Sequence, residues 1–415
     1  MPTRRQLLTA LAGTALLGAC SRENPDDFTV SLDPVWEQPA QMFSMTATLT
    51  SDTLLLAGTE VDATRIVGHD LATGAVRWLV GDDSSVAVPK LGDVEIQTLG
   101  KRAEQSLLNR RNFVAGPVLP LSFWNDRGAG PSGVVGLDPA SGTPVWGRTL
   151  VAEQSDLRLG TVVMAATESV VLAVTRPITT VTRPDFGQEL FASGPTTTHA
   201  LDAATGEVLW SVADVLVVWA DQDTALAFRT SSDTMSGPSS VICGLDLAAG
   251  EPRWTGPDPV SLAAVAGDHA LFHGADSADD GLLVRVSTGE VVPVPNVGRA
   301  RPHLLAGEPP TLAWGTYDGS QTVTTQVVGE PDQVSGTKPS RFDTTRIARD
   351  LLWGVLPSWS NPTTVAFDRT GHQRSARIDS GVPIHVTEDW LIFVRTGFEV
   401  PTSYVVVPHR VTARG

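Results

Sequence analysis

The chain has 415 residues, of which 41% are hydrophobic and 18% are charged, and this is the composition of a globular protein and not of a disordered one. The formal net charge is −16 and lysines are scarce, so no basic run is present that could follow a nucleic-acid backbone. The 38 glycines and 29 prolines favour short elements joined by turns, which excludes a helical bundle.

The first 19 residues predict an export signal. Arg4 and Arg5 precede an apolar run over 7–17, and two small residues lead to Cys20. As a helix this run would be about 16 Å long, which is too short to span a bilayer core, so we expect 1–19 to be a signal peptide. The pattern resembles a bacterial lipoprotein signal, with paired arginines similar to those of twin-arginine export. That resemblance implies that Cys20 is lipidated and anchors the chain to the extracytoplasmic face of the cell membrane; a plain secretory signal is the alternative.

A motif of the form Asp-x-x-(Thr/Ser/Ala)-Gly-x-x-x-Trp occurs four times. Its Asp, Gly and Trp positions are Asp70, Gly74 and Trp78; Asp138, Gly142 and Trp146; Asp202, Gly206 and Trp210; and Asp246, Gly250 and Trp254. The Asp side chain can accept hydrogen bonds from the backbone of a tight turn, and the Gly can adopt a positive φ. We expect each copy to form a hairpin turn followed by a strand whose Trp packs against a neighbouring sheet. Because these residues recur at equivalent places, they are assigned to the fold and not to one active site.

Apolar segments predict a strand before each turn, at 54–57, 113–115, 170–173, 225–228, 270–272, 312–314, 351–353 and 390–393. Each is followed by a second strand, near Ile66, Val134, Thr198, Val241, Leu283, Val323, Val365 and Tyr404. Weaker copies of the turn occur at 285–290 and 367–371. This pattern predicts eight four-stranded sheets. Seven is the alternative, because 311–330 contains neither the Asp nor the Thr-Gly of the motif.

The last predicted strand, which begins at Tyr404, has no turn after it, so its sheet lacks an outer strand. Residues 35–37, Val-Trp-Glu, are expected to supply that strand and to pair with 404–407. Such pairing would remove an open sheet edge.

The repeat resembles that of the PQQ-like (quinoprotein-type) β-propeller family, Ala-x-Asp-x-x-Thr-Gly-x-x-x-Trp, over about residues 33–410. The resemblance implies an all-β, eight-bladed propeller of four-stranded blades that is closed by an N-terminal strand. The expected organisation is then a signal peptide at 1–19, a linker at 20–32 and a single propeller at 33–410.

In the dehydrogenases of this family, the resemblance would imply a bound quinone, a Ca²⁺ ion, a catalytic Asp and a disulfide between adjacent cysteines. This chain has only Cys20 and Cys243, and Cys243 lies in an apolar run that predicts burial. Neither the pair His269 and His273 nor the acidic residues in 274–281 are expected to bind a metal. We therefore expect no cofactor, no metal and no catalytic residue.

Two long connections, 119–133 and 176–197, are expected to be loops. They contain four aromatic candidates for partner binding, Phe123, Trp124, Phe186 and Phe191. The alternative is that these rings pack back onto the sheets. The interpretation is a monomeric, lipid-anchored, non-catalytic scaffold that binds an envelope protein and no nucleic acid. Within the family it most resembles the outer-membrane assembly lipoprotein of the β-barrel machinery. A PQQ-dependent quinoprotein dehydrogenase and a receptor for a sugar or cell-wall ligand are the alternatives.

Overall fold

The computed structural model describes most of the chain from residue 28 to residue 413. The described residues are 28–40, 43–60, 63–80, 117–124, 131–152, 159–183, 186–191, 195–230, 240–257, 261–273, 281–294, 303–305, 307, 309–315, 323–329, 333–335, 346–348, 351–356, 363–368, 373–378, 381–396 and 404–413. All regular elements in these ranges are strands, which confirms the expected all-β class.

The described strands form eight antiparallel sheets, which we number along the chain. The first four are sheet 1 with β3 (Phe43–Leu49), β4 (Thr53–Glu60), β5 (Ala63–Asp70) and β6 (Val76–Val80); sheet 2 with β7 (Leu119–Trp124), β8 (Ser132–Leu137) and β9 (Pro144–Val151); sheet 3 with β10 (Leu159–Ala166), β11 (Val170–Arg183), β13 (Thr197–Asp202) and β14 (Val208–Ala213), with β12 (Phe186–Phe191) added to β11; and sheet 4 with β15 (Val215–Ala220), β16 (Thr224–Thr230), β17 (Ser240–Asp246) and β18 (Pro252–Thr255).

The other four complete the series. They are sheet 5 with β19 (Ser261–Ala266), β20 (His269–His273), β21 (Gly281–Arg285) and β22 (Val291–Val294); sheet 6 with β23 (His303–Leu305), β24 (Thr311–Gly315), β25 (Val323–Val327) and β26 (Gln333–Ser335); sheet 7 with β27 (Arg346–Ala348), β28 (Leu351–Leu356) and β29 (Thr363–Phe367); and sheet 8 with β30 (Val382–Val386), β31 (Trp390–Thr396) and β32 (Tyr404–Ala413), to which β1 (Val30–Pro34) and β2 (Gln38–Ala40) are added.

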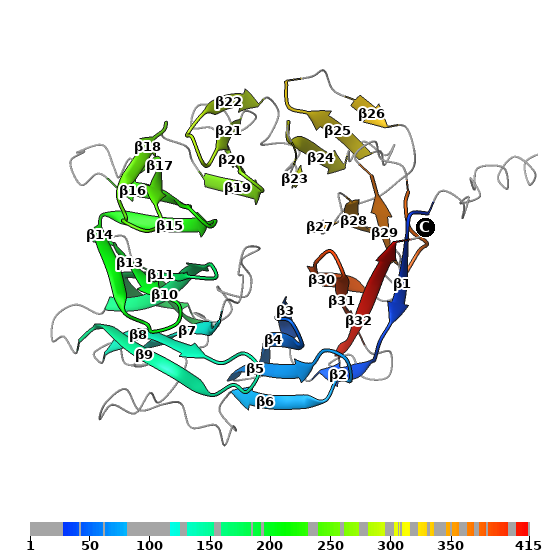
Figure 1. The fold of residues 1–415 in the computed structure, drawn as a ribbon, viewed down its shortest axis with the longest axis horizontal. Coiled ribbons are helices and arrows are strands. Elements are labelled where there is room, and N and C mark those ends of the chain that lie inside the picture. The colour runs from blue at the N-terminus through cyan, green and yellow to red at the C-terminus, as the bar shows by residue number, and fades with distance from the viewer. Residues whose placement is uncertain are drawn as a thin grey trace, which may run out of the picture.

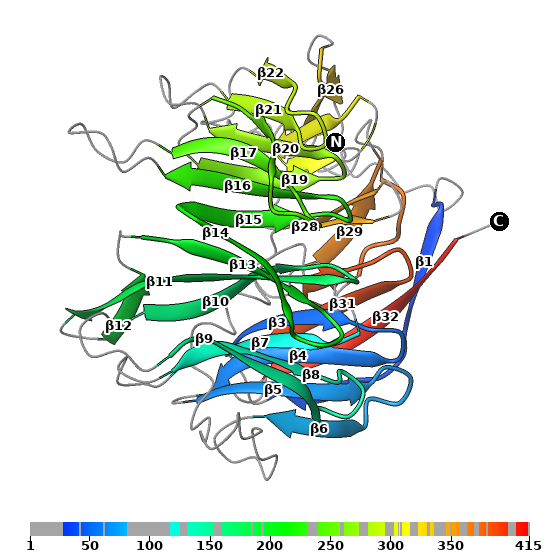
Figure 2. The ribbon, with the colours of Figure 1, turned by 60° about the vertical axis from the view of Figure 1, so that its left-hand side comes forward.

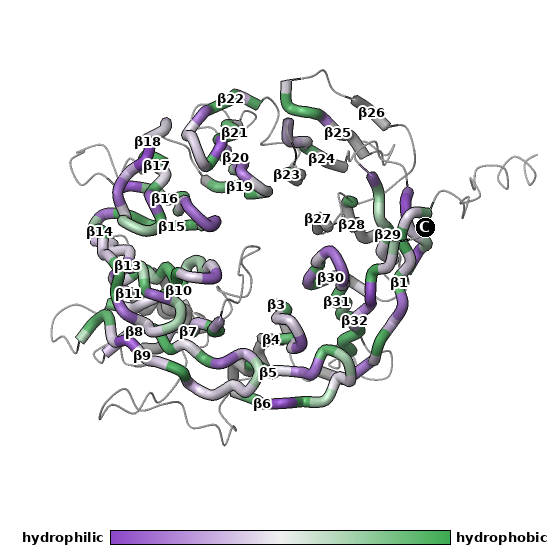
Figure 3. The backbone as a smooth tube through the Cα atoms, viewed as in Figure 1, coloured by the Kyte–Doolittle hydropathy of each residue, from purple (hydrophilic) through white to green (hydrophobic). Residues whose placement is uncertain are grey.

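The sheets stand side by side around a common centre, which is the arrangement of a β-propeller (Figure 1). In sheet 1, for example, β3 lies nearest the centre and β6 lies at the outer rim, and the chain then passes to the next sheet. Hydrophobic residues occur in strands around the whole ring (Figure 3). Each sheet is thus able to bury apolar side chains against a neighbour on either side.

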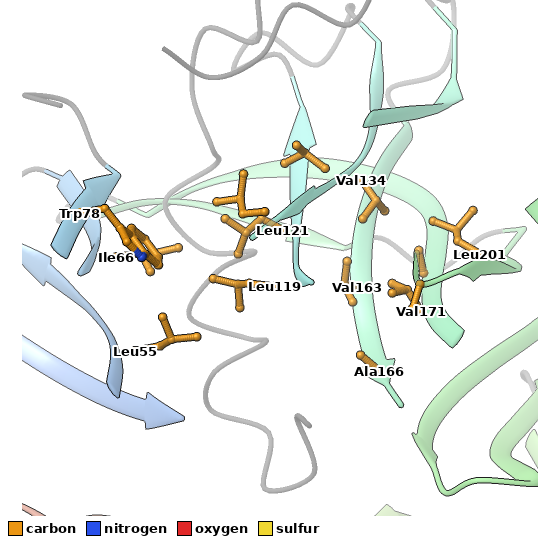
Figure 4. Close-up of a cluster of buried hydrophobic side chains, with 14 residues drawn as sticks. Leu55, Ile66, Trp78, Leu119, Leu121, Val134, Val163, Ala166, Val171 and Leu201 are labelled. Carbon is orange, nitrogen blue, oxygen red and sulfur yellow. The ribbon is translucent and has the colours of Figure 1, made fainter. Parts of the chain in front are cut away.

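The core lies between neighbouring sheets. Leu55 of sheet 1, Leu119 of sheet 2 and Val171 of sheet 3 belong to one buried cluster, which also contains Trp78 (Figure 4). Middle strands are buried on both faces, and every residue of β8 is buried. Outer strands such as β14 are instead mostly exposed. This gradient of burial explains why the middle strands read as continuous apolar runs.

Seven of the eight predicted strands before the turns are confirmed, and the eighth, 113–115, lies outside the described residues. Among the described residues, the strand that pairs with the Val134 strand is β7. Pro120 occupies β7, and a proline makes a short apolar run look like a loop. The uncertain segment 311–330 contributes β24 and β25 to a four-stranded sheet.

The N-terminal segment pairs with the last strand, but not at the residues that the sequence predicted. Val30 pairs with Ala413 through β1, and Gln38 pairs with Val406 through β2. Residues 35–37 lie between the two strands, and in this gap the N–H of Val35 donates a 2.9 Å hydrogen bond to a backbone carbonyl of β32. The two ends of the chain therefore share sheet 8.

Candidate functional site

The repeated Asp residues organise the turns, as expected. Asp70 Oδ1 accepts hydrogen bonds from the N–H groups of Ala72 (3.1 Å) and Thr73 (2.8 Å). Equivalent bonds to Asp138, Asp202 and Asp246 are 2.8–3.0 Å long in the other turns. These carboxylates therefore stabilise the turns by accepting hydrogen bonds from backbone N–H groups.

The repeated Trp residues clasp each sheet to the next. Trp78 of β6 donates its indole N–H to the carbonyl of Pro139 in the turn of sheet 2, at 2.9 Å. The same bond recurs at 2.7–2.9 Å from Trp146 to Ala203, from Trp210 to Leu247 and from Trp254 to Val286. In every case the acceptor is the residue directly after the first residue of the turn. We call this arrangement a Trp clasp.

Each Trp clasp also requires a glycine. The turn glycines Gly74, Gly142, Gly206, Gly250 and Gly289 have φ between 68° and 76°. An indole lies flat over each of them, and a Cβ built on any of the five would come within 2.7 Å of that ring. Both the positive φ and the close approach therefore exclude a larger residue.

Trp36 makes the same clasp at the other end of the chain. Its indole N–H donates to the carbonyl of Leu71 at 2.9 Å, and its ring covers Gly74. The ring also stacks on His69, with centroids 5.7 Å apart. Trp36 thus joins the N-terminal segment of sheet 8 to sheet 1, and the sequence correctly identified it as the missing Trp.

Sheet 5 has a substitution that sequence reasoning did not resolve. Arg285 replaces the Asp of the motif. Asp268, from the preceding turn, accepts a backbone hydrogen bond of this turn in its place. The N–H of Ser287 donates to Asp268 Oδ1 at 2.7 Å, and Arg285 pairs with the same carboxylate at 3.6 Å. A compensating residue that lies 17 positions upstream carries no local signal in the sequence.

In two of the four complete copies of the motif, an arginine pairs with the Asp of its own turn. Arg77 bonds Asp70 at 2.6 Å and Asp52 at 2.8 Å, and Arg253 bonds Asp246 at 2.7 Å. Hydrogen bonds from Arg77, and then from Thr73, lower the pKa of Asp70 to about 2. In sheets 2 and 3 the residue equivalent to these arginines is aliphatic.

The four predicted partner-binding aromatics lie on strands and not in loops. Phe123 and Trp124 are the last residues of β7 and pair with Gly133 and Ser132. Phe186 and Phe191 begin and end β12, which forms a hairpin with the second half of β11. The structure therefore corrects the loop prediction and places these residues on neighbouring sheets 2 and 3. Their side chains lie outside the described part of the structure.

The two cysteines are far from equivalent. Cys20 and the signal segment lie outside the described residues. Cys243 lies on β17 in the core between sheets 3 and 4, and burial raises the pKa of its thiol. The chain has no adjacent cysteine pair, so it cannot form the disulfide that the dehydrogenase resemblance would imply. His269 and His273 occupy the two ends of β20, the first buried and the second half-buried.

Within the described ranges, no three His, Cys, Asp or Glu side chains are grouped as metal ligands would be. The same part of the chain contains no helix that is long and apolar enough to cross a membrane.

No known family profile matches the sequence, and no curated protein matches it. Similar solved structures include BamB from Moraxella catarrhalis, at 13% identity over 92% of this chain and 100% of that chain, with a TM-score of 0.38. Quinohemoprotein alcohol dehydrogenase from Comamonas testosteroni is 10% identical over 94% of this chain and 78% of that chain, with a TM-score of 0.49. The β-propeller domain of the Trilobed protease from Pyrococcus furiosus is 12% identical over 80% and 98%, with a TM-score of 0.43. At these identities we carry no activity, substrate or partner over to this chain.

Proposed function

We propose that this protein is a non-catalytic, eight-bladed β-propeller that is closed by its N-terminal segment and binds another protein of the cell envelope. In this proposal a lipid on Cys20 holds it at the extracytoplasmic face of the cell membrane. The eight sheets formed by the described strands support this number of blades. Pairing of β1 and β2 with β32, together with the clasp from Trp36 to sheet 1, supports closure at sheet 8.

One observation carries the binding role: the β11–β12 hairpin departs from the repeated blade. β11 has 14 residues, and its first six, Val170–Thr175, pair with β13 as in other blades. Its last six, Ile178–Arg183, pair only with β12 in the described chain. The hairpin extends beyond the ends of neighbouring strands (Figure 2). Blade formation does not require this extension, and such excursions from a rigid scaffold are where proteins commonly carry binding residues.

The hairpin also has features that suit a protein partner. Phe186 and Phe191 lie on β12, and aromatic residues supply much of the energy of protein interfaces. Within the described residues, β12 pairs on one side only, so its other edge could receive an extended segment of a partner. The repeated Asp, Gly and Trp residues are already used by turns and clasps, which favours a scaffold over an enzyme.

Site-specific photo-crosslinking in the native cell tests this proposal. A benzoylphenylalanine at Phe191 should yield one discrete adduct with an envelope protein, whereas the same probe at Val76, an exposed position of sheet 1, should not yield that adduct. A variant that lacks 178–191 should keep its melting temperature, because β10, β11, β13 and β14 remain paired, and should lose the partner on co-purification. An identical set of adducts from both positions, or unchanged co-purification after the deletion, would exclude the hairpin as the binding site.

A further inference from the structure

The turn ends of the sheets differ at the residue before the clasp Trp. This residue is Arg77 in sheet 1 and Arg253 in sheet 4, and each arginine neutralises the Asp of its own turn. In sheets 2 and 3 the equivalent residues are Val145 and Leu209, which are 54% and 48% exposed. Among the four sheets with a complete motif, the two that lack the arginine are neighbours, since Trp146 of sheet 2 clasps the turn of sheet 3.

Loss of the arginine leaves acidic groups beside apolar ones. Asp138 and Asp202 accept hydrogen bonds from their own turns, and neither has an ion-pair partner within the described chain. Glu207 follows the turn glycine of sheet 3 and is exposed. Arg148 of sheet 2 reaches the turn of sheet 3, where its Nε donates a 2.8 Å hydrogen bond to the carbonyl of Gly206. Asp138 thus lies in the same hairpin as the exposed Val145, and Asp202 and Glu207 lie in the same hairpin as the exposed Leu209.

We define the turn-end surface as the aliphatic and acidic residues of these two sheets, namely Val145, Val208, Leu209, Asp138, Asp202 and Glu207. We propose that the turn-end surface binds a basic, amphipathic segment of another protein. Aliphatic side chains of that segment would cover Val145 and Leu209, and its Lys or Arg residues would neutralise the acidic rim. This site is separate from the β11–β12 hairpin, so the chain would have two docking regions.

Charge complementarity selects this occupant over two others. A second copy of the chain carries the same net charge of −16, so approach of two copies is opposed by like-charge repulsion. An anionic membrane surface would be repelled by the same carboxylates. A basic segment gains from both charge and apolar burial, and paired features of this kind provide specificity at interfaces.

A set of synthetic peptides tests the proposal on the purified full-length protein. In the first peptide Lys and Leu alternate at every second residue with Ser between them, so an extended chain presents both types on one face. The second replaces Leu by Ser, and the third replaces Lys by Glu. We expect the first peptide to bind at least about tenfold more tightly than either of the others in calorimetric titration.

Two matched variants locate the site. Leu209→Arg inserts the residue that sheets 1 and 4 have at this position, and it should weaken binding at least about tenfold. Val292→Arg makes the same charge change at the equivalent, 36% exposed position of sheet 5, and it should alter binding less than about twofold. Leu209→Ser, which removes apolar contact without adding charge, should also weaken binding, and all three should melt like the parent because both sites are exposed.

Several outcomes would overturn the proposal. Equal weakening by both arginine variants would mean general electrostatic attraction, and no weakening by either would place the peptide elsewhere. Equal affinity for the Lys/Leu and Lys/Ser peptides would remove the apolar contribution. Absence of binding by the Lys/Leu peptide up to about 1 mM, the range of weak interactions, would contradict the site itself.

Discussion

Each clasp tryptophan stabilises two sheets at once. Trp146 belongs to β9, where its ring packs under Gly136 of its own sheet, and its other contacts are with Gly206 and the carbonyl of Ala203 in sheet 3. A hydrogen bond of this type contributes about 1 kcal/mol to stability, and the indole adds the burial of a large apolar surface. The small residues around the ring are therefore as important as the ring itself.

Substitution of a clasp glycine should lower the free energy of unfolding by more than the positive φ alone would cause. Gly206→Ala forces an L-residue to a φ of 70° and places a methyl group against Trp146. The matched control is Gly329→Ala, where φ is 91° but no atom lies within 4 Å of the added Cβ. We expect a loss of about 1 kcal/mol at Gly329 from φ alone, and about 1–3 kcal/mol more at Gly206 from overpacking. Denaturant unfolding measures both, and equal losses would mean that the ring contact does not restrict the site.

The ion pair of sheet 1 predicts a pH dependence. The folded pKa of Asp70 is lowered from 3.8 to about 2, first by the hydrogen bond from Arg77. A depressed folded pKa favours the folded state at pH values above about 4, and that contribution is lost as the pH falls from about 4 to about 2. Arg77→Ala should raise the pKa of Asp70 toward 3.8 in a carboxyl NMR titration, while Asp202, whose pKa is lowered by Thr205 and not by an arginine, should titrate as before. An unchanged Asp70 titration would contradict this assignment.

At the scale of elements, the first and last strands share sheet 8. Ser31 and Thr412 are register partners on β1 and β32, and their hydroxyl oxygens are 2.6 Å apart. These residues are 381 positions apart in sequence, so their contact joins the two ends of the described chain. A covalent link at this point is a direct probe of the seam.

In a Cys20→Ser background, Ser31→Cys with Thr412→Cys should form a disulfide on mild oxidation. The loop it closes is so long that the free energy of unfolding should rise by up to about 5 kcal/mol. The control is Ser31→Cys with Arg410→Cys, because Arg410 pairs with Asp33 and lies two residues out of register. A diagonal pair is too far apart for an unstrained disulfide. Mobility on a non-reducing gel reports the link, and equal yields from the two pairs would exclude this register.

The sequence predicted elements well where the chemistry is local. The turns were predictable because Asp, Gly and Trp lie within nine residues of one another, and Trp36 was predictable as a missing member of that series. β7 and β12 were missed, since Pro120 and Gly187 interrupt short apolar runs that then look like loops. The pairing of the N-terminal segment was misplaced at 35–37 because the strand breaks there to position Trp36, and the two flanking strands make the ladder.

At the scale of the molecule, the clasps form a continuous series. They run from the N-terminal segment of sheet 8 through sheets 1, 2, 3, 4 and 5, and each uses an indole of one sheet and a turn of the next. In sheet 5 the Trp position holds Pro293, so the series ends there. Sheet 5 packs on sheet 6, and sheet 7 packs on sheet 8, through apolar clusters. The clasped part of the ring includes the hairpin and the turn-end surface, so both proposed docking regions lie on sheets that clasps join.

The proposed lipid anchor would determine where this protein acts. Ten residues separate Cys20 from the start of β1 at Val30, and an extended chain spans at most about 3.6 Å per residue. A lipid on Cys20 would therefore hold sheet 8 within about 36 Å of the bilayer. Two or more acyl chains are sufficient for stable attachment, whereas one is marginal.

Fractionation of the native cell after a Cys20→Ser change tests the central claim, a membrane-tethered propeller, most directly. The parent protein should sediment with membranes and yield an acylated N-terminal peptide that begins at Cys20 in mass spectrometry. The variant should appear in the soluble extracytoplasmic fraction, and its unchanged melting temperature would show that only the anchor was lost, since Cys20 lies before the first strand. A variant that stays with the membrane, or a parent protein whose Cys20 thiol is unmodified, would contradict the account.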